Sequence, residues 1–318
     1  MASFPPPSWY SDTVSKLIDE VLPAILGPLS DDRAWAYLYA CTLWTEKIGD
    51  DELLHLNDKL RSKGGREQAL RGLEWMEKNF LPADADGDRD PRLHLDKVFQ
   101  QYLYDRPDQA KQPPQRNNPT GRTFETCIQE LIHRLCGIRP AREPQLSTLA
   151  GFELVPPGYH SQPDLALFGP RDFRLVISTK WTLRKERIGT YLHESWFYKQ
   201  RKADLQTVFV LNDFNSNILQ WLVSDPLCDR VYHPAKQMLL ATYDPFDGAT
   251  EISSADLIDR KKREKYERYL SLDTRIHDLK DLFRDVRRLK AVDAPLDPVE
   301  DVGPDDDLEE DDDDEADV

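Results

Sequence analysis

Cysteine is scarce in this sequence, and long apolar runs are absent. The 318 residues include only four cysteines, which are widely scattered and form no CxxC pair, so we expect free thiols rather than a zinc site or a disulfide scaffold. No run of eighteen apolar residues occurs, and the N-terminus has no charged start followed by an apolar core. We therefore expect a cytoplasmic protein without a membrane span or a secretory signal.

Negative charge is plentiful but unevenly distributed. The formal net charge is −16, and residues 300–318 contain thirteen acids and no base. Subtracting those thirteen leaves a charge of only −3 on the rest of the chain, so the overall charge does not exclude nucleic acid as a partner. We expect residues 293–318 to form a disordered acidic tail, which either keeps the chain soluble or binds a partner.

The first third of the chain has the pattern of helices. Between residues 9 and 105, five segments repeat apolar residues at spacings of three and four, with Asp, Ser or Gly between them. Residues 105–120 are polar and proline-rich, which indicates a linker or a loop. The length also exceeds that of one typical domain, so the sequence predicts an all-helical accessory domain over 1–110 and a principal domain over 111–292.

The second half changes from a helical period to short apolar strands. Residues 121–137 have the pattern of a helix, and the segments 163–168, 173–180 and 206–212 have the pattern of strands. Residues 188–202, between the last two strands, again read as a helix. The order helix, strand, strand, helix, strand predicts an α/β fold with a mixed central sheet flanked by helices.

Side chains suited to metal chemistry lie at the ends of two of these strands. Side chains alternate between the faces of a strand, so Ser178 and Lys180 are expected on one face. Asp164 follows a proline at the start of the preceding strand, where its carboxylate can project past the sheet edge. A carboxylate can hold Mg²⁺ and a nearby lysine can stabilise charge or orient water, which is what phosphodiester cleavage requires.

These residues resemble the signature of the PD-(D/E)xK nuclease superfamily. Pro163 and Asp164 stand where the PD is expected, and Ser178, Thr179 and Lys180 stand where the (D/E)xK is expected. Ser178 departs from the pattern, because an Asp or Glu is usual at that place. The resemblance implies a Mg²⁺-dependent nuclease with a restriction-endonuclease-like core in the principal domain.

The residues after Lys180 make the resemblance more specific. Arg184, Glu186, Arg187 and Glu194 follow Lys180 at offsets of four, six, seven and fourteen. This spacing resembles the CCGG family of Type II restriction endonucleases, in which a Ser occupies the place of the second acid and a K-x3-R-x-(D/E)-R signature reads the CCGG core. In that family the acid has moved to the following helix, so the resemblance implies that Glu194 supplies it. The BsaWI-like branch, which has a helical N-terminal domain, is the branch that we expect.

The helix before the first strand implies a third acid at the metal site. Gly121 to Glu125 reads G-x-x-F-E and resembles the helix that supplies a further glutamate in these nucleases. Glu130 is the alternative on the same helix, although it lies outside that pattern. The resemblance therefore implies three Mg²⁺ ligands within a catalytic set of five residues: Asp164, Glu194 and Glu125 as ligands, with Lys180 and Ser178.

The basic segment after Lys180 also fits the chemistry of a GC-rich DNA site. Guanine offers two acceptors to a bidentate arginine and cytosine offers an amino donor to a carboxylate, so Arg184, Glu186 and Arg187 are predicted to read the bases. Contacts to phosphates are predicted for Lys185, Lys199, Arg201 and Lys202. The implied partners are double-stranded DNA with a palindromic site, a second copy of the chain in a homodimer or higher homo-oligomer, and a cognate DNA methyltransferase of the same system without direct contact.

Other residues and other functions are left open by the sequence. His160 and His193 flank the predicted site and either touch a phosphate or are structural, and Asp213 is interpreted as a turn residue at a strand end. Apolar residues from Leu272 to Val286 predict one long final helix with a packing face or a dimer contact. The same core would also suit a repair or transposition nuclease, and Ser178 could instead mark a catalytically decayed DNA-binding or regulatory protein.

Overall fold

A computed structural model describes five ranges of the chain: 7–46, 119–156, 162–168, 173–243 and 260–291. The predicted helices between 47 and 118, the expected domain boundary near 110 and the acidic tail lie outside them. All four cysteines lie inside them, and none of the four forms a disulfide within the described ranges. None of the helices in these ranges combines the length and the apolar character that crossing a membrane requires.

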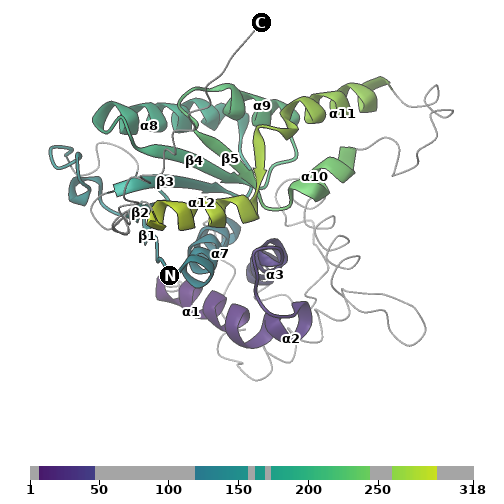
Figure 1. Ribbon diagram of the computed structural model, residues 1–318, viewed down its shortest axis with the longest axis horizontal. Coiled ribbons are helices and arrows are strands. Elements are labelled where there is room, and N and C mark those ends of the chain that lie inside the picture. Colours follow the sequence, from purple (N-terminus) through teal and green to yellow (C-terminus); the bar gives the residue numbers. More distant parts are fainter. Residues whose placement is uncertain (1–6, 47–118, 157–161, 169–172, 244–259, 292–318) are drawn as a thin grey trace, which may run out of the picture.

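A six-stranded mixed sheet lies at the centre of the described part of the chain (Figure 1). Its strands lie side by side in chain order. The first three pair antiparallel, and the pairs from the third strand to the sixth are parallel. The strands are β1 (Ala141–Arg142), β2 (Leu165–Phe168), β3 (Phe173–Lys180), β4 (Gln206–Leu211), β5 (Arg230–His233) and β6 (Ile276–Asp278). The predicted α/β fold with a mixed sheet is confirmed.

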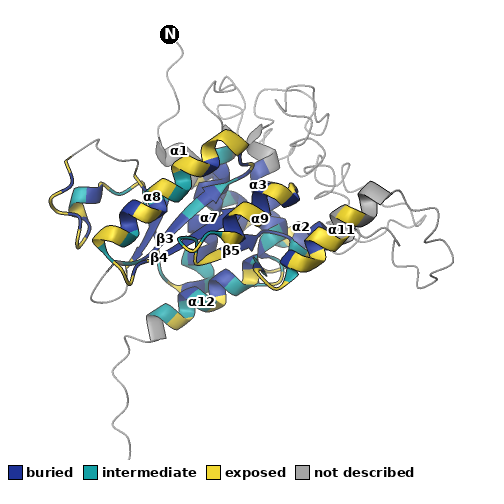
Figure 2. Cartoon of the chain, turned by 90° about the horizontal axis from the view of Figure 1, so that it is seen from above, coloured by how far each residue is buried: buried dark blue, intermediate teal, exposed yellow. Residues whose placement is uncertain are grey.

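Helices cover both faces of the sheet, and the alternation of β3 shows which helix meets which face (Figures 1 and 2). Val176 packs with Phe197 and Tyr198 of α8 (Ile188–Arg201), whereas Leu175 and Ile177 belong to the larger core that contains α7 (Pro119–Cys136). Figure 1 shows α9 (Ser216–Ser224) on the side of α8 and α12 (Leu279–Ala291) on the side of α7. Ser178 and Lys180, which have the same parity as Val176, therefore belong to the α8 face.

The helices of residues 7–46 pack against α7 on the side away from the sheet (Figure 1). They are α1 (Pro7–Lys16), a π-helical turn (Leu17–Val21), α2 (Leu22–Leu26) and α3 (Ala34–Glu46). Their buried side chains join the sheet and α7 in one continuous hydrophobic core. Arg134 of α7 also donates two hydrogen bonds of 2.7 Å to the Asp19 carboxylate. The described part of the N-terminal region is helical, as predicted.

The prediction of one long final helix is wrong. The structure has α10 (Lys236–Tyr243) and α11 (Arg260–Asp273) before β6, and α12 after it. Ile276 pairs with Val231 of β5, so it belongs to the parallel edge strand. Helix α12 starts anew because the Asp278 side chain accepts the Lys280 N–H at 3.2 Å while the Asp278 N–H donates to the Asp281 side chain at 3.1 Å. This reciprocal arrangement is a capping box, in which an acid three residues later bonds back to the cap.

Candidate active site

Asp164 and Lys180 meet at one edge of the sheet. Asp164 immediately precedes β2 and Lys180 is the last residue of β3, and the antiparallel register that pairs Leu165 with Ile177 brings them together. The Asp164 Oδ2 atom accepts the Thr179 N–H at 2.7 Å and the Lys180 ammonium at 2.5 Å. Both side chains are partly open to solvent, at 22% and 18% exposure. A ligand can therefore reach both the Asp164 carboxylate and the Lys180 ammonium.

The Lys180 ammonium also contacts α8. Its Nζ atom lies 4.8 Å from the centre of the Tyr191 ring, a distance at which the ring face attracts a cation. Burial lowers the pKa of Lys180, but electrostatic interactions with Asp164, Tyr191 and Glu125 outweigh burial, so the pKa is raised overall. Lys180 therefore stays protonated and can stabilise negative charge. The sequence analysis did not single out Tyr191. Its position three residues before Glu194 on the same predicted helix was the signal that could have identified it.

Glu194 lies on α8, the helix whose Tyr191 contacts Lys180. It is partly buried, one turn after Tyr191 and one turn before Tyr198 on the helix. Tyr198 is 3% exposed. Its pKa is raised far above the ordinary value, chiefly by burial and further by the negative charges of Glu194 and Asp164. Both carboxylates therefore lie within electrostatic range of the Tyr198 hydroxyl.

Glu125 approaches the site from α7. It is 7% exposed, and its carboxylate accepts a hydrogen bond of 2.6 Å from Arg142. Burial raises the pKa of Glu125 to about 7, with Arg142 opposing the rise and Asp164 adding to it. Asp164 is thus close enough to Glu125 for their charges to repel.

Glu130, the alternative acid on α7, has a different role. Its carboxylate is fully buried and forms ion pairs with Arg134 and with Arg139, the latter at 2.7 Å. A buried carboxylate bonded to two guanidinium groups is already neutralised. Glu130 therefore ties α7 to the chain that follows it, and Glu125 is the acid on this helix that Asp164 influences.

The donor set suits a hard divalent cation, although the described residues include no cluster of three or more metal-binding side chains. Asp164 is bonded to Lys180 and Glu125 to Arg142. Mg²⁺ needs only one or two carboxylates together with water and phosphate oxygens. Burial is the main cause of the raised pKa of Glu125, and the repulsion from Asp164 that adds to it is what a bound cation relieves. The acids from β2, α7 and α8 therefore fit Mg²⁺ chemically.

The predicted base-reading residues stand exposed between β3 and α8. A 3₁₀ turn over Lys185–Arg187 leads into the helix, and the Arg187 N–H donates to the Arg184 carbonyl at 3.0 Å. Arg184, Glu186 and Arg187 are exposed, and their side chains form no ion pair within the described ranges. Lys185 lies over the Trp221 ring of α9, 4.8 Å from its centre. These charges are available to a ligand.

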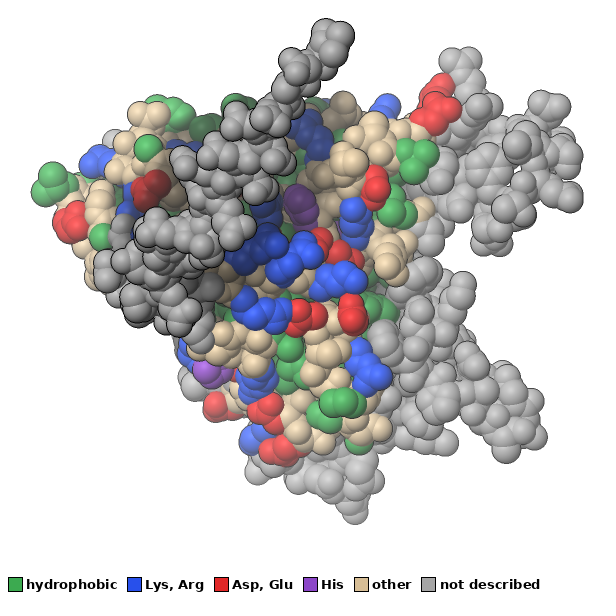
Figure 3. All heavy atoms as spheres, in the orientation of Figure 1, with side chains coloured by type: hydrophobic (Ala, Val, Ile, Leu, Met, Phe, Trp, Pro, Cys, Tyr) green, Lys and Arg blue, Asp and Glu red, His purple; other side chains and the backbone are tan. Residues whose placement is uncertain are grey.

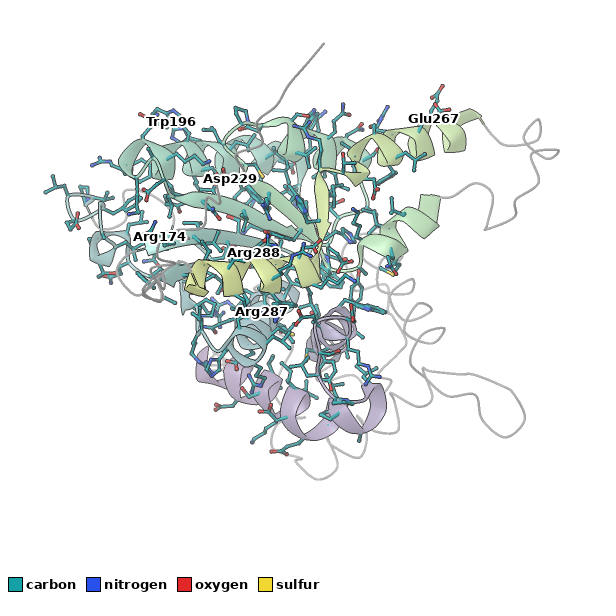
Figure 4. All side chains as sticks on the ribbon, in the orientation of Figure 1. Arg174, Trp196, Asp229, Glu267, Arg287 and Arg288 are labelled. Carbon is teal, nitrogen blue, oxygen red and sulfur yellow. The ribbon has the colours of Figure 1, made fainter. Side chains whose placement is uncertain are left out.

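The other predicted phosphate contacts lie at the far end of α8. The helix has 14 residues and so spans about 21 Å at 1.5 Å per residue. Lys199 forms a 2.7 Å ion pair with Asp229, which Figure 4 labels, and Lys202 lies 3.8 Å from Asp204. Arg201 lies 5.5 Å from the centre of the Phe197 ring. The structure thus separates Lys199, Arg201 and Lys202 from the base-reading residues by the length of the helix.

Two other groups of charged or aromatic residues lie away from the acids. His193 is exposed and stacks on Trp196 at 5.5 Å, and Figure 4 shows Trp196 on the side of α8 that faces away from the sheet; His160 lies outside the described residues. Figure 3 shows Lys and Arg mixed with Asp and Glu in the middle of its view, where α12 lies. Two pairs there are Arg287 with Asp31 and Arg284 with Asp281. That surface is largely neutralised.

Comparisons with known proteins give two solved structures. The restriction endonuclease PspGI in a complex with substrate DNA matches with 15% sequence identity and a TM-score of 0.44 over 91% of this chain and 94% of that chain. Ecl18kI, metal-depleted and in complex with uncleaved DNA, matches with 14% identity and a TM-score of 0.32 over 93% of this chain and 88% of that chain. No family model and no curated protein matches the sequence.

Proposed function

We propose that this chain is a Type II restriction endonuclease of the PD-(D/E)xK superfamily that cleaves double-stranded DNA at a palindromic site with a CCGG core. The observation that carries the proposal is the meeting of Asp164 and Lys180 at the ends of two neighbouring strands, at 2.5 Å. Glu125 from α7 acts electrostatically on both Asp164 and Lys180, and Glu194 and Asp164 both act on Tyr198 of α8. A carboxyl group with a raised pKa close to an accessible aspartate–lysine pair is typical of a catalytic site.

Mg²⁺ is the cofactor that this donor set supports. Asp164, Glu194 and Glu125 would hold it, and it would supply positive charge at the scissile phosphate and make water more acidic. The protein groups have separate tasks. Lys180, held protonated by Asp164, stabilises charge on the phosphate or orients the attacking water, and Ser178 leaves room beside it for the Glu194 carboxylate.

Arg184, Glu186 and Arg187 are assigned to the bases of the CCGG core. Their exposure and their lack of ion pairs among the described residues support this role, as does their position next to the strand that ends in Lys180. The arginines suit guanine, and the glutamate suits the amino group of cytosine. A palindromic site calls for two-fold symmetry, so we propose that the protein acts as a homodimer or a higher homo-oligomer.

The phosphate contacts predicted along the chain divide into two groups. Lys185 lies next to the base-reading residues and supports a contact close to the site. Lys199 is engaged with Asp229, so its use on DNA requires that this ion pair opens. Arg201 and Lys202 would contact phosphates about 21 Å away along α8.

The decisive test is digestion of a plasmid of known sequence in the presence of Mg²⁺ or Ca²⁺, followed by sequencing of the ends. We expect ends at a fixed position in sites that contain CCGG with Mg²⁺, and binding without product with Ca²⁺. Cleavage of branched DNA alone would instead identify a repair or transposition nuclease. Specific binding in Mg²⁺ without product would identify a catalytically decayed DNA-binding protein.

A further inference from the structure

Two residues that follow β4 hold both ends of the connection between Lys180 and the base-reading residues. The Asn212 N–H donates to the Lys180 carbonyl at 3.1 Å. The Asp213 Oδ2 atom accepts the Leu183 N–H at 3.0 Å. Leu183 immediately precedes Arg184. The three residues between Lys180 and Arg184 are therefore held at both ends by two consecutive residues that directly follow β4.

The support is buried and continues into the N-terminal helices. Asp213 is 5% exposed and Asn212 is fully buried. The second Asp213 oxygen accepts the Asn215 N–H at 2.8 Å, so both carboxylate oxygens are bonded. The Asn212 side chain accepts a hydrogen bond from the Tyr39 hydroxyl of α3. The end of β4 is therefore held in place by contacts of its own, independently of the connection that it supports.

The aromatic side chains around the connection restrict it further. Trp181, the first residue after Lys180, is 8% exposed. Its ring packs edge-on against Tyr39 at 5.3 Å and against Phe124 of α7 at 5.6 Å. A bulky side chain held by two helices cannot turn without disturbing both. The connection is thus fixed by packing at its start and by a carboxylate at its end.

We propose that Asp213 is a positioning residue that fixes Arg184, Glu186 and Arg187 relative to Lys180, so that the correct base contacts and the correct placement of the lysine are obtained together. The inference rests on the proposed function. A hydrogen bond from an N–H to a carboxylate is stronger than one between neutral groups. A displacement of about 1 Å at a reacting group can reduce a rate about a hundredfold, so loss of this anchor is expected to affect reading and cutting alike.

Asp225 provides a matched control. Its Oδ1 atom accepts the Leu227 N–H at 2.8 Å, the same bond to the second residue onward that Asp213 makes to Asn215. Its other hydrogen bonds in the described part of the chain lie within its own turn, between Leu222 and Cys228. Asp225→Asn therefore removes a similar carboxylate without touching the connection.

The experiment compares the wild type, Asp213→Asn and Asp225→Asn, each checked first for folding by circular dichroism and thermal unfolding. Affinity is measured in Ca²⁺ for a duplex with a CCGG core, for its single-base variants and for an unrelated duplex, and cleavage is measured in Mg²⁺. We expect Asp213→Asn to lose about tenfold or more in discrimination between CCGG and its variants, together with a slower cleavage of CCGG. Binding to the unrelated duplex stays unchanged, and Asp225→Asn discriminates like the wild type.

Three outcomes overturn parts of this account and are distinguishable. Wild-type discrimination by a folded Asp213→Asn protein removes the positioning role and leaves the proposed function intact. An equal loss in Asp225→Asn shows that any turn defect has the same effect and also removes the role. If the wild type itself binds all duplexes equally, the proposed function and this inference both fail. Should Asp213→Asn not fold, Asp213→Ser, which keeps a hydroxyl acceptor, is measured against the same duplexes with the same criteria.

Discussion

Two aspartate–lysine pairs lie at opposite ends of the strands of the sheet, and their local contacts are alike. Asp164 holds Lys180 and Asp229 holds Lys199, at 2.5 and 2.7 Å, and each aspartate also accepts one main-chain N–H at 2.7 Å. The two lysine side chains are equally exposed, at 18%. The pairs lie at the two ends of β4, separated by about 13 Å at 3.3 Å per residue. Neither the bond nor the exposure distinguishes a candidate site from a structural clamp.

The difference lies in the charges that surround each pair. Asp229 bonds to Thr207 at the start of β4 and so joins that strand to the turn before β5. Near Asp164, burial chiefly and the repulsion from Asp164 in addition raise the pKa of Glu125 to about 7. Beside the Asp164 pair, the ionised form of one further carboxyl group, that of Glu125, is therefore disfavoured. Unfavourable charge of this kind is tolerated where a ligand compensates for it.

The largest expected effect separates the two aspartates directly. Asp164→Asn and Lys180→Ala should each reduce DNA cleavage about a hundredfold or more, because they remove a proposed metal ligand and the cation beside it. Asp229→Asn should leave the cleavage rate within about threefold of the wild type. Single-turnover cleavage at saturating DNA measures all three. Equal losses of cleavage in Asp164→Asn and Asp229→Asn would show that the Asp164 pair has no catalytic role that the Asp229 pair lacks.

The next expected effect concerns Glu194 and the place left by Ser178. Glu194→Ala should abolish most cleavage, because the acid on α8 is lost. Adding Ser178→Glu should restore part of the rate, since an acid on β3 then points to the α8 face that Lys180 occupies. The same cleavage assay compares the single and double variants. Near-normal cutting by Glu194→Ala would remove Glu194 from the mechanism.

A smaller effect, on stability, tests the accumulated charge through Glu125. Its pKa is raised from 4.5 to about 7 in the folded chain, so folding favours the protonated form. Stability is therefore fully present below pH 4.5 and is lost as the pH rises to about 7, by about 3 kcal/mol at most. Glu125→Gln cannot ionise and should lack this loss.

Thermal unfolding of both proteins between pH 4 and pH 8 without divalent cations measures the difference. Added Mg²⁺ should then restore stability to the wild type near neutral pH, because a cation favours the ionised carboxylate. Identical pH profiles for the wild type and Glu125→Gln would show that the charge at the Asp164 edge is no greater than elsewhere.

The smallest expected effect distinguishes the two ends of α8. Arg184→Ala or Arg187→Ala should cost about tenfold in affinity for CCGG per half-site while binding to other duplexes changes little, because a bidentate contact to guanine contributes roughly 1–3 kcal/mol. Lys202→Ala should weaken binding to all duplexes alike and reduce its salt dependence. Binding titrations at several salt concentrations separate the two patterns. A uniform loss in the arginine variants would show that the segment is only a basic patch.

Much of the sheet could be predicted because short apolar runs and alternation reveal strands directly. The segments 163–168, 173–180 and 206–212 correspond to β2, β3 and β4, and the predicted 188–202 helix corresponds to α8. The last helix was wrong because apolar spacings of three and four continue through Ile276 although that residue lies in a strand. The missed signal was the spacing of Asp278 and Asp281, which form a capping box.

The site was predictable in its local parts and not in its long-range contacts. Asp164 and Lys180 flank two adjacent strands, so their meeting follows from hairpin geometry. The bond from Leu183 to Asp213 and the ion pair of Lys199 with Asp229 each join residues thirty positions apart. No local period encodes such contacts, since they depend on how β4 and β5 lie beside β3. Asp213 therefore looked like an ordinary turn residue in the sequence.

The anchoring of Trp181 and Asn212 by Tyr39 has a consequence for how such a chain could change over generations. Lys180 and Arg184 stand at the two ends of one short connection, and that connection packs against a helix more than a hundred positions earlier. If these side chains read DNA, an altered specificity would have to preserve that support. Substitutions of the exposed Arg184 and Arg187 side chains would change the proposed base contacts alone. Substitutions of the buried residues behind them would instead be expected to abolish activity before they changed the specificity.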